Sequence, residues 1–426
     1  MIQINYPKLL VLSNNSFSKS NSNGRTLGSL LHGWPKEKIA QFCISSDGAD
    51  FEVCNNYFCV TDSDVLKSIL SFTPVKRRDL YNSKIINANT KNGYVRYKKT
   101  TIKMFARNLA WMVGIWKGND FFTWLNDFKP EIVLLQNGES FFMHKLAINI
   151  AKKYDAKLAI FNTEGYYFFH KDYFPSDGFF GKQLFKIYKK TYNSYFRDFM
   201  HKCSKQIYGN LKLKEDYDKE FGNKNSIVVY TSSSLKFSPK LNYNQIPTFS
   251  YLGNLGFDRP QALIEFSLVL AEINKDFKLD IYGFAKDKAM EDSLQSYPSI
   301  RFHGAITYSQ VINVIENSDF LVHAESQDET WLESLKYGFS TKIADSISSG
   351  KLFILYASPG IACSQYIIEN KAGIFASERG ELKEKITKVL NSTEIKSEYE
   401  EAALQTSKTN HNPNQNIALM RSYLTK

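Results

Sequence analysis

Residues 337–351 read YGFSTKIADSISSGK and lie between two apolar runs. The stretch combines glycine, hydroxyl side chains and lysine. The pattern predicts a loop feeding a helix: Gly338 frees the backbone, Ser340 or its neighbour caps the helix, and the first-turn N–H groups favour an anion. Lys342 adds a positive charge, and Asp345 falls on the same helical face, where it can accept a hydrogen bond from a ribose hydroxyl. The segment predicts a nucleotide-diphosphate site, although a capped helix with a surface Lys342–Asp345 pair fits the same residues.

Two further loops carry the same chemistry after predicted strands. In GNLGFDR, Gly253 and Gly256 allow a close backbone approach and Arg259 begins the next helix, where a phosphate is favoured. The long polar loop SNNSFSKSNSNGRT ends at Gly24, and Arg25 opens another helix. The alternative for either loop is a glycine turn beside a solvated arginine.

One carboxylate follows a predicted strand in the first half of the chain. Glu164 is the first ionisable residue after KLAIFNT, where it can act as a base toward an acceptor hydroxyl or orient it. His144 and His170 are lower-ranked candidates, because a lone histidine is more often a structural side chain.

The segment Lys76–Arg107 holds ten lysines and arginines against the single acid Asp79, with aromatic residues among them. Such a surface suits anionic lipid headgroups. It also fits single-stranded nucleic acid, or a merely solvated basic face. We favour an anionic membrane surface and no nucleic acid.

Short apolar runs alternate with helical patterns along most of the chain, which predicts βα units and parallel sheets. Strands are expected at KLLVLSN, KIAQFCIS, EIVLLQN, KLAIFNT and SIVVYTS, and, after a polar break at residues 232–247, at TFSYLGNL, KLDIYG, IRFHGA, DFLVHAES, KLFILYAS and AGIFAS. No GxGxxG follows either first strand and no GxxxxGK[ST] occurs, which weighs against a dinucleotide oxidoreductase and a P-loop NTPase. In such sheets ligands bind beyond the carboxyl ends of the strands.

Composition agrees with two domains. The 426 residues are 43% apolar, and the formal charge of +11 favours an anionic partner. Five cysteines without CxxC spacing, and no basic leader before an apolar stretch, favour a reduced, cytoplasmic compartment. No run of 18 apolar residues predicts a membrane span.

The sequence resembles the GT4-type glycosyltransferases of the GT-B fold, the bacterial enzymes of capsule and O-antigen assembly. GFSTKIADSISSGKLFILYASPG is similar to their [FP]STK-I-x-[DE]-Y-L-A-S-G-[KR]-P segment, YLGNLGFDR to their first C-terminal strand and phosphate loop, and NSNGRTLGSLLHGWPKEKIAQF to their N-terminal glycine loop. The resemblance covers nearly the whole chain. It implies two doubly wound Rossmann-like domains facing a central cleft, residues 1–238 for the acceptor and 239–405 for the nucleotide sugar, with a helix at 406–426 crossing back to the N-terminal domain.

The resemblance also implies roles for particular positions. Arg259 matches the basic residue that contacts the diphosphate, and Asp345 the second acid of the ExxxxxxxE signature, a ribose ligand. The first acid is replaced by Tyr337, and Asn254 stands where many members have an arginine. Catalysis is assigned to Glu164, Lys342 and Arg259. The implied donor-binding set is Gly24, Arg25, Gly253, Asn254, Arg259, Gly338, Phe339, Ser340, Thr341, Lys342, Asp345 and Gly360.

We therefore expect transfer of a sugar from a nucleotide-diphosphate donor to a hydroxyl of a lipid-linked glycan. No DxD pair follows a predicted strand, so positive charge and helix N-termini, not a metal or other cofactor, are expected to stabilise the leaving diphosphate. Retention of the anomeric configuration is implied by the family. The alternatives are a degenerate GT-B binding subunit and a GT-B-fold nucleotide-sugar epimerase.

Overall fold

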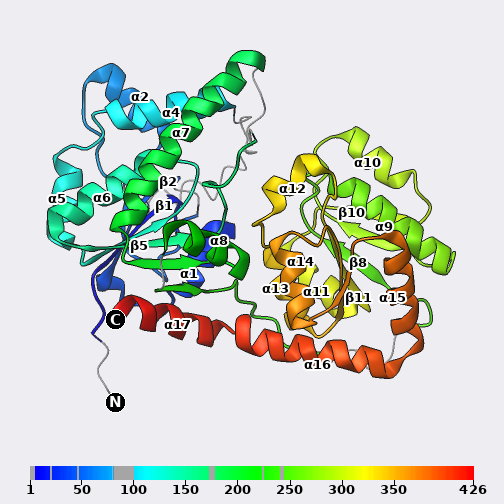
Figure 1. The fold of residues 1–426 in the computed structure, drawn as a ribbon. Coiled ribbons are helices and arrows are strands. Elements are labelled where there is room, and N and C mark those ends of the chain that lie inside the picture. Colours follow the sequence, from blue (N-terminus) through cyan, green and yellow to red (C-terminus); the bar gives the residue numbers. More distant parts are fainter. Residues whose placement is uncertain are drawn as a thin grey trace. The chain divides into compact units, whose positions relative to one another are not determined.

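The computed structural model divides the chain into two compact units, each built around a parallel β-sheet (Figure 1). Unit 1 comprises residues 1–209, 213–229 and 417–426, and unit 2 comprises residues 210–212 and 230–416. The structure describes residues 5–19, 22–45, 48–78, 80, 100–171, 178–222, 225–239 and 244–426. Among these, no helix is both long and apolar enough to cross a bilayer.

The sheet of unit 1 has the order β3-β2-β1-β4-β5-β6-β7, so the direction of winding reverses between β1 and β4. Its strands are β1 Leu9–Asn15, β2 Ile39–Ser45, β3 Asn56–Cys59, β4 Ile132–Gln136, β5 Lys157–Asn162, β6 Lys205–Tyr208 and β7 Ser226–Val228. Its helices are α1 Ser22–Leu30, η1 Lys36–Lys38, α2 Asp62–Ser71, α4 Thr101–Val113, α5 Asn119–Phe128, α6 Phe142–Tyr154, α7 Gly178–Lys202 and α8 Leu211–Phe221.

The sheet of unit 2 repeats this winding, in the order β10-β9-β8-β11-β12-β13 with the reversal between β8 and β11. Its strands are β8 Phe249–Leu252, β9 Leu279–Tyr282, β10 Ile300–Gly304, β11 Phe320–Ala324, β12 Leu352–Tyr356 and β13 Ile374–Ala376. Its helices are α9 Arg259–Ile273, α10 Lys288–Gln295, α11 Tyr308–Asn317, α12 Glu329–Leu335, α13 Thr341–Ser349, α14 Ala362–Asn370, α15 Arg379–Asn391 and α16 Thr393–Asn410.

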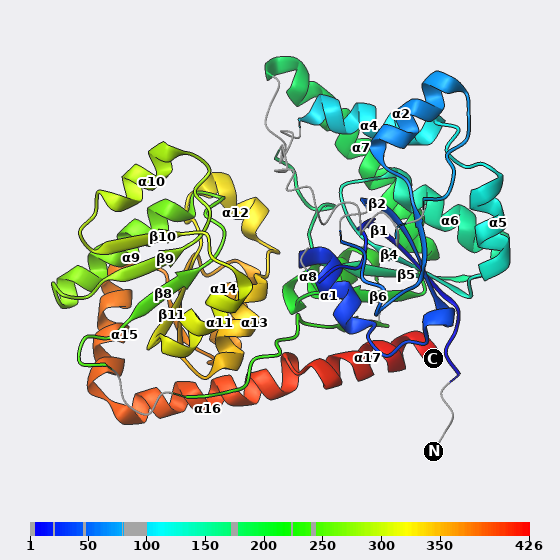
Figure 2. The ribbon, with the colours of Figure 1, turned by 180° about the vertical axis from the view of Figure 1, so that it is seen from behind.

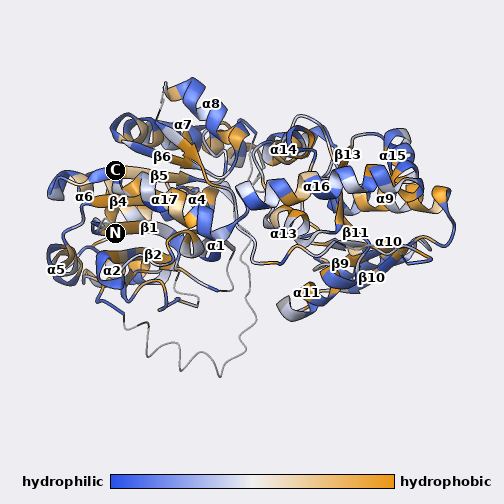
Figure 3. Cartoon of the chain, turned by 90° about the horizontal axis from the view of Figure 1, so that it is seen from below, coloured by the Kyte–Doolittle hydropathy of each residue, from blue (hydrophilic) through white to orange (hydrophobic). Residues whose placement is uncertain are grey.

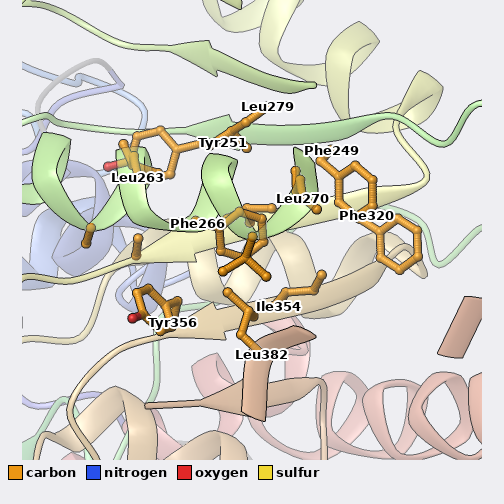
Figure 4. Close-up of a cluster of buried hydrophobic side chains, with 14 of the residues drawn as sticks. Phe249, Tyr251, Leu263, Phe266, Leu270, Leu279, Phe320, Ile354, Tyr356 and Leu382 are labelled. Carbon is orange, nitrogen blue, oxygen red and sulfur yellow. The ribbon is translucent and has the colours of Figure 1, made fainter. Parts of the chain in front are cut away.

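Helices cover both faces of each sheet, which explains why the central strands are nearly continuous apolar runs. Every residue of β4, β11 and β12 is buried. Figure 3 shows the strands of unit 1 mostly in the hydrophobic colour. In unit 2, side chains from α9 pack onto the sheet, as Phe266 does against Tyr356 (Figure 4). The strands are therefore held from both sides, and their carboxyl ends have defined positions.

The last helix, α17 Pro413–Thr425, returns the chain to unit 1. The hydroxyl of Tyr423 accepts a hydrogen bond from the backbone N–H of Gln206 at 2.8 Å, and Lys205 Nζ donates to the Tyr423 carbonyl at 2.8 Å. Tyr423 and Leu424 also join the apolar core of unit 1. The C-terminal residues thus complete the N-terminal unit.

The predicted pair of doubly wound, Rossmann-like units is confirmed. Two strands, β3 and β6, were not predicted, because polar Asn56, Lys205 and Gln206 interrupt their short apolar patterns. One helix also begins earlier than expected: α1 starts at Ser22, which places Gly24 in its first turn and not at the end of the preceding loop.

Candidate functional site

In unit 2 the glycine loop follows β8, the strand at the reversal point. A Cβ atom on Gly253 would lie 2.6 Å from the Tyr251 hydroxyl, so the close approach requires glycine here. The Tyr251 hydroxyl donates to the Asn254 carbonyl at 2.6 Å, and Asn254 Oδ1 accepts from the Gly256 N–H at 2.7 Å. The side chain of Asn254 therefore fixes the loop that leads into α9.

Arg259, at the first position of α9, lies in a bidentate ion pair with Glu325, which follows β11. Arg259 Nε and Nη2 donate to the two carboxylate oxygens of Glu325 at 2.7 and 2.8 Å. His323 Nε2 lies 2.9 Å from the same carboxylate, and the side chains of Arg259 and Glu325 are only 11% and 6% exposed. Burial alone would raise the pKa of Glu325, but the hydrogen bond of His323 and the charge of Arg259 hold it below its ordinary value.

This ion pair links the two strands at the reversal point of unit 2, where open α/β sheets bind ligands. A guanidinium has five N–H donors, of which Glu325 takes two. Nη1 also faces the Asn254 carbonyl at 3.3 Å. The guanidinium is thus held in one orientation at the edge of the glycine loop, which is the place predicted for a diphosphate contact.

The segment that opens α13 has the predicted cap. The Ser340 hydroxyl accepts from the Lys342 N–H at 3.3 Å, and the helix begins at Thr341. Lys342 is exposed in the first turn of this helix. Tyr337, at the position of the missing acid, is 1% exposed, and its carbonyl accepts from Asn210 Nδ2 at 2.9 Å. The side chain at this position is therefore a buried aromatic ring and not a carboxylate.

The remaining predicted donor residues of unit 2 have different surroundings. Asp345 Oδ1 accepts a hydrogen bond from the Ser233 hydroxyl at 2.7 Å. Phe339 lies in an aromatic cluster, with ring centroids 5.5 Å from Tyr230 and 5.0 Å from Tyr366. Gly360 is exposed in the loop after β12 and has open space where a Cβ would be. The structure thus ties Asp345 and Phe339 to residues of unit 2 that the sequence did not associate with them.

In unit 1 the predicted glycine-loop residues lie at the start of α1. A Cβ on Gly24 would be 2.2 Å from the Ser16 carbonyl oxygen, so glycine permits the contact between this helix and the loop after β1. Arg25, the next residue, is half-buried. The close approach accounts for Gly24 without a ligand.

A cavity of about 820 Å³ lies in unit 1, at the carboxyl ends of β1, β2 and β4 and against α2 and α4. It is lined by Asn14, Asn15, Ile44, Ser45, Asp62, Val65, Leu66, Lys103, Met104, Ala106, Arg107, Ala110, Trp111, Glu139 and Tyr166. Polar strand ends facing a helical wall of apolar residues with a few charged ones are properties of a ligand site at a reversal point.

Two carboxylates interact at the carboxyl ends of β4 and β5. Burial, with the charge of Glu139 as a second cause, raises the pKa of Glu164 to about 7. Glu139 lines the cavity and faces Asn14 Nδ2 at 3.5 Å. A carboxyl group that titrates near neutral pH can accept a proton from a hydroxyl and later release it.

The two histidines named from the sequence differ in burial. His144 Nε2 lies 3.0 Å from Asn137 Oδ1 and Nδ1 lies 3.3 Å from the Phe141 carbonyl. Burial lowers the pKa of His144 to about 4, so this ring is neutral and part of the core of unit 1. His170 is exposed.

Sequence reasoning missed Glu139 and Glu325. Each follows a buried strand within a few residues, in EIVLLQNGE and DFLVHAE, as Glu164 does after KLAIFNT. The rule that selected Glu164, an ionisable residue beyond a strand end, would have found both. Of the basic segment Lys76–Arg107, residues 79 and 81–99 lie outside the part of the chain that the structure describes.

The sequence matches no protein-family model and no curated protein. The structure is similar to sucrose-phosphate synthase from Thermosynechococcus elongatus, at 12% identity and a TM-score of 0.60 over 97% of both chains. It is similar to HepE of Anabaena in complex with UDP, at 9% identity and a TM-score of 0.62 over 98% of this chain and 99% of that one. The lipopolysaccharide outer core galactosyltransferase WaaB gives 14% identity and a TM-score of 0.56 over 98% and 99%.

These similarities extend over both units, so the chain has the GT-B fold expected from its sequence.

Proposed function

We propose that the chain is a GT4-type glycosyltransferase, which moves a sugar from a nucleotide-diphosphate donor to a hydroxyl of a lipid-linked glycan in capsule or O-antigen synthesis. The observation that supports the proposal is a cation at the start of each of two helices of unit 2: Arg259 at the first position of α9, oriented by Glu325, and Lys342 in the first turn of α13. HepE, which is similar in fold, has been solved in complex with UDP and in complex with UDP-glucose.

Each group has a chemical task in this reaction. The bond between the anomeric carbon and the donor diphosphate breaks, and Lys342 with the N-terminus of α13 stabilises the charge that develops on the diphosphate. Arg259 supplies a second fixed positive charge. The acceptor hydroxyl forms the new bond, and Glu164 takes its proton, since its pKa of about 7 lets it act near neutral pH. The acceptor oxygen attacks the anomeric carbon on the face from which the diphosphate departs, so the anomeric configuration is retained, and positive charge performs the role of a metal.

We further propose that the protein works in the cytoplasm at the membrane surface, where a lipid-linked acceptor is presented. A second candidate function is a binding subunit without turnover. It is favoured by buried Tyr337, which replaces the first acid of the family signature.

The proposal is tested by thermal stabilisation with a panel of nucleotide sugars, because a ligand that binds only the native state raises the melting temperature. We expect one nucleotide sugar to stabilise the wild type, with a smaller effect in Lys342→Ala. The matched control is Lys275→Ala. Lys275 is an exposed lysine that precedes β9, on the side of the sheet where the strands begin. Donor hydrolysis or transfer then distinguishes an enzyme from a binding subunit, and no response to any nucleotide sugar would refute both.

A further inference from the structure

Helices α2 and α4 present apolar side chains on the outside of unit 1. On α4, Ile102, Leu109 and Val113 are 45%, 43% and 70% exposed, and their spacing of seven and four residues places them on one side of the helix. On α2, Leu66 and Leu70 are one turn apart and 55% and 81% exposed. The two helices pack together, and we call these five exposed residues the α2–α4 face.

The α2–α4 face belongs to a larger apolar end of unit 1. In the two opposed views of Figures 1 and 2, α2, α4 and the start of α7 lie at the same end of this unit. Phe179 and Phe180, in the first turn of α7, are 72% and 80% exposed. An exposed apolar surface of this extent marks an interaction site and not an ordinary solvated surface.

Positive charge accompanies this apolar surface. Helix α4 carries Lys103 and Arg107 and no acidic residue. The two acids of α2, Asp62 and Asp64, are paired with Arg107 and Arg78. Lys67, on α2, is exposed as well. Apolar side chains flanked by cations match the hydrocarbon and the headgroups of an acidic bilayer.

The cavity of unit 1 adjoins the same face. Leu66 of the α2–α4 face lines the cavity, and so does Ala106, which lies between Ile102 and Leu109 on the exposed side of α4. The other end of the cavity is formed by the strand ends, where Glu139 lies. A molecule with a polar head and a hydrocarbon tail thus matches the cavity and the adjoining apolar face.

We infer that the α2–α4 face rests on the surface of an acidic lipid bilayer, and that the cavity beside it receives the polar end of the lipid-linked acceptor. The assignment of the acceptor rests on the proposed function, whereas the bilayer contact does not. A lipid surface matches both features: its hydrocarbon suits the five apolar side chains, and its anionic headgroups suit the exposed Lys67 and Lys103.

The bilayer contact is tested by co-sedimentation with vesicles of phosphatidylcholine alone or with phosphatidylglycerol, without any nucleotide sugar. The variant is the double substitution Leu70→Asp and Val113→Asp, at exposed positions outside the cavity. The control is Phe284→Asp, which changes an apolar side chain of unit 2 that is 74% exposed. We expect the double variant to keep the wild-type melting temperature and to bind acidic vesicles at least about tenfold more weakly, because apolar burial is lost at two sites. The control should bind as the wild type does.

Two results would overturn the inference: wild-type binding by the double variant, or no vesicle binding by the wild type. A wild type that binds no vesicles and is dimeric, with a monomeric double variant, would assign the face to a second copy of the chain. If the double variant loses its melting transition, Leu70→Ser with Val113→Ser replaces it under the same criteria. Vesicle binding without response to any nucleotide sugar would refute the proposed transferase and leave the bilayer contact standing. Once transfer is measured, the double variant should lose transfer to an acceptor embedded in vesicles and keep transfer to a short-chain soluble acceptor.

Discussion

Replacing Glu164 by glutamine should stabilise the protein, and by more at high pH than at low pH. The pKa of Glu164 is about 7 in the folded chain, against an ordinary value of 4.5. At low pH the carboxyl group is protonated in both the folded and the unfolded chain, so it does not lower the free energy of unfolding. It does lower it at higher pH, because the folded-state pKa is the higher of the two. The cost grows as the pH rises from the unfolded to the folded pKa, and it is constant above that. Glutamine, which resembles the protonated carboxyl in shape, removes this cost.

The size of the effect follows from the two pKa values. At about 1.4 kcal/mol for each pKa unit, the full cost is about 3 kcal/mol above neutral pH and about 1 kcal/mol near pH 5. The assay is urea unfolding of wild type and Glu164→Gln at both pH values, with Glu37→Gln, at an exposed position of unit 1, as the control. The control should change the free energy of unfolding by less than about 0.5 kcal/mol at either pH.

A second measurement connects the same carboxyl group with transfer. If Glu164 is the base, transfer by the wild type should rise as this group loses its proton around pH 7, and Glu164→Gln should lack that rise. Equal stabilisation at the two pH values, or destabilisation that grows with pH, would show that Glu164 is not a desolvated carboxyl of raised pKa. In that case its assignment as the base would lose its physical ground.

Three further substitutions test the nucleotide site in unit 2. Lys342→Ala should reduce transfer by about a hundredfold, because it removes one contact to the developing charge; near wild-type rates would contradict this. Arg259→Ala should also lower the free energy of unfolding, by about 3–5 kcal/mol in urea titrations, since it leaves the buried Glu325 carboxylate without its guanidinium, and an unchanged stability would be the opposing result. Asp345→Asn should raise KM more than it lowers kcat if Asp345 binds the ribose, whereas reduced kcat at constant KM would place it nearer the anomeric carbon, and an unaltered reaction would refute its role in donor binding.

The fold could be read from local patterns because both sheets are covered on two sides. Fully buried strands such as β4 and β12 appear as apolar runs, and that signal needs no tertiary information. The strands β3 and β6 were not predicted, because polar residues interrupt their apolar runs and that signal is then missing. Lys205 is buried in β6, where its Nζ donates to the Tyr423 carbonyl from the far end of the chain. Such a strand is indistinguishable from a loop until that distant partner is known.

The sequence predicts which types of residue belong to the candidate site, but not which of them contact one another. Glycines, a helix cap and cations after strands are local features, and the structure has the Ser340 cap and the tight approach at Gly253. That Arg259 lies against Glu325, 66 residues away, depends on β8 and β11 being neighbours. Phe339 shows the same limit, because its aromatic neighbours come from distant parts of unit 2. Strand order decides these contacts, and residue type alone does not encode it.

Both units place a carboxylate after a central strand, and the neighbouring charges are positive in one case and negative in the other. Glu325 lies between an arginine and a histidine, which hold its pKa low, so it stays charged and orients Arg259. Glu164 lies near a second carboxylate, Glu139, in a desolvated position, and its pKa rises to about 7. Carboxyl groups whose surroundings drive their pKa values apart can take different chemical roles. In the proposed transfer, Glu325 is therefore a positioning residue for the guanidinium at the donor diphosphate, and Glu164 is the group whose protonation state changes.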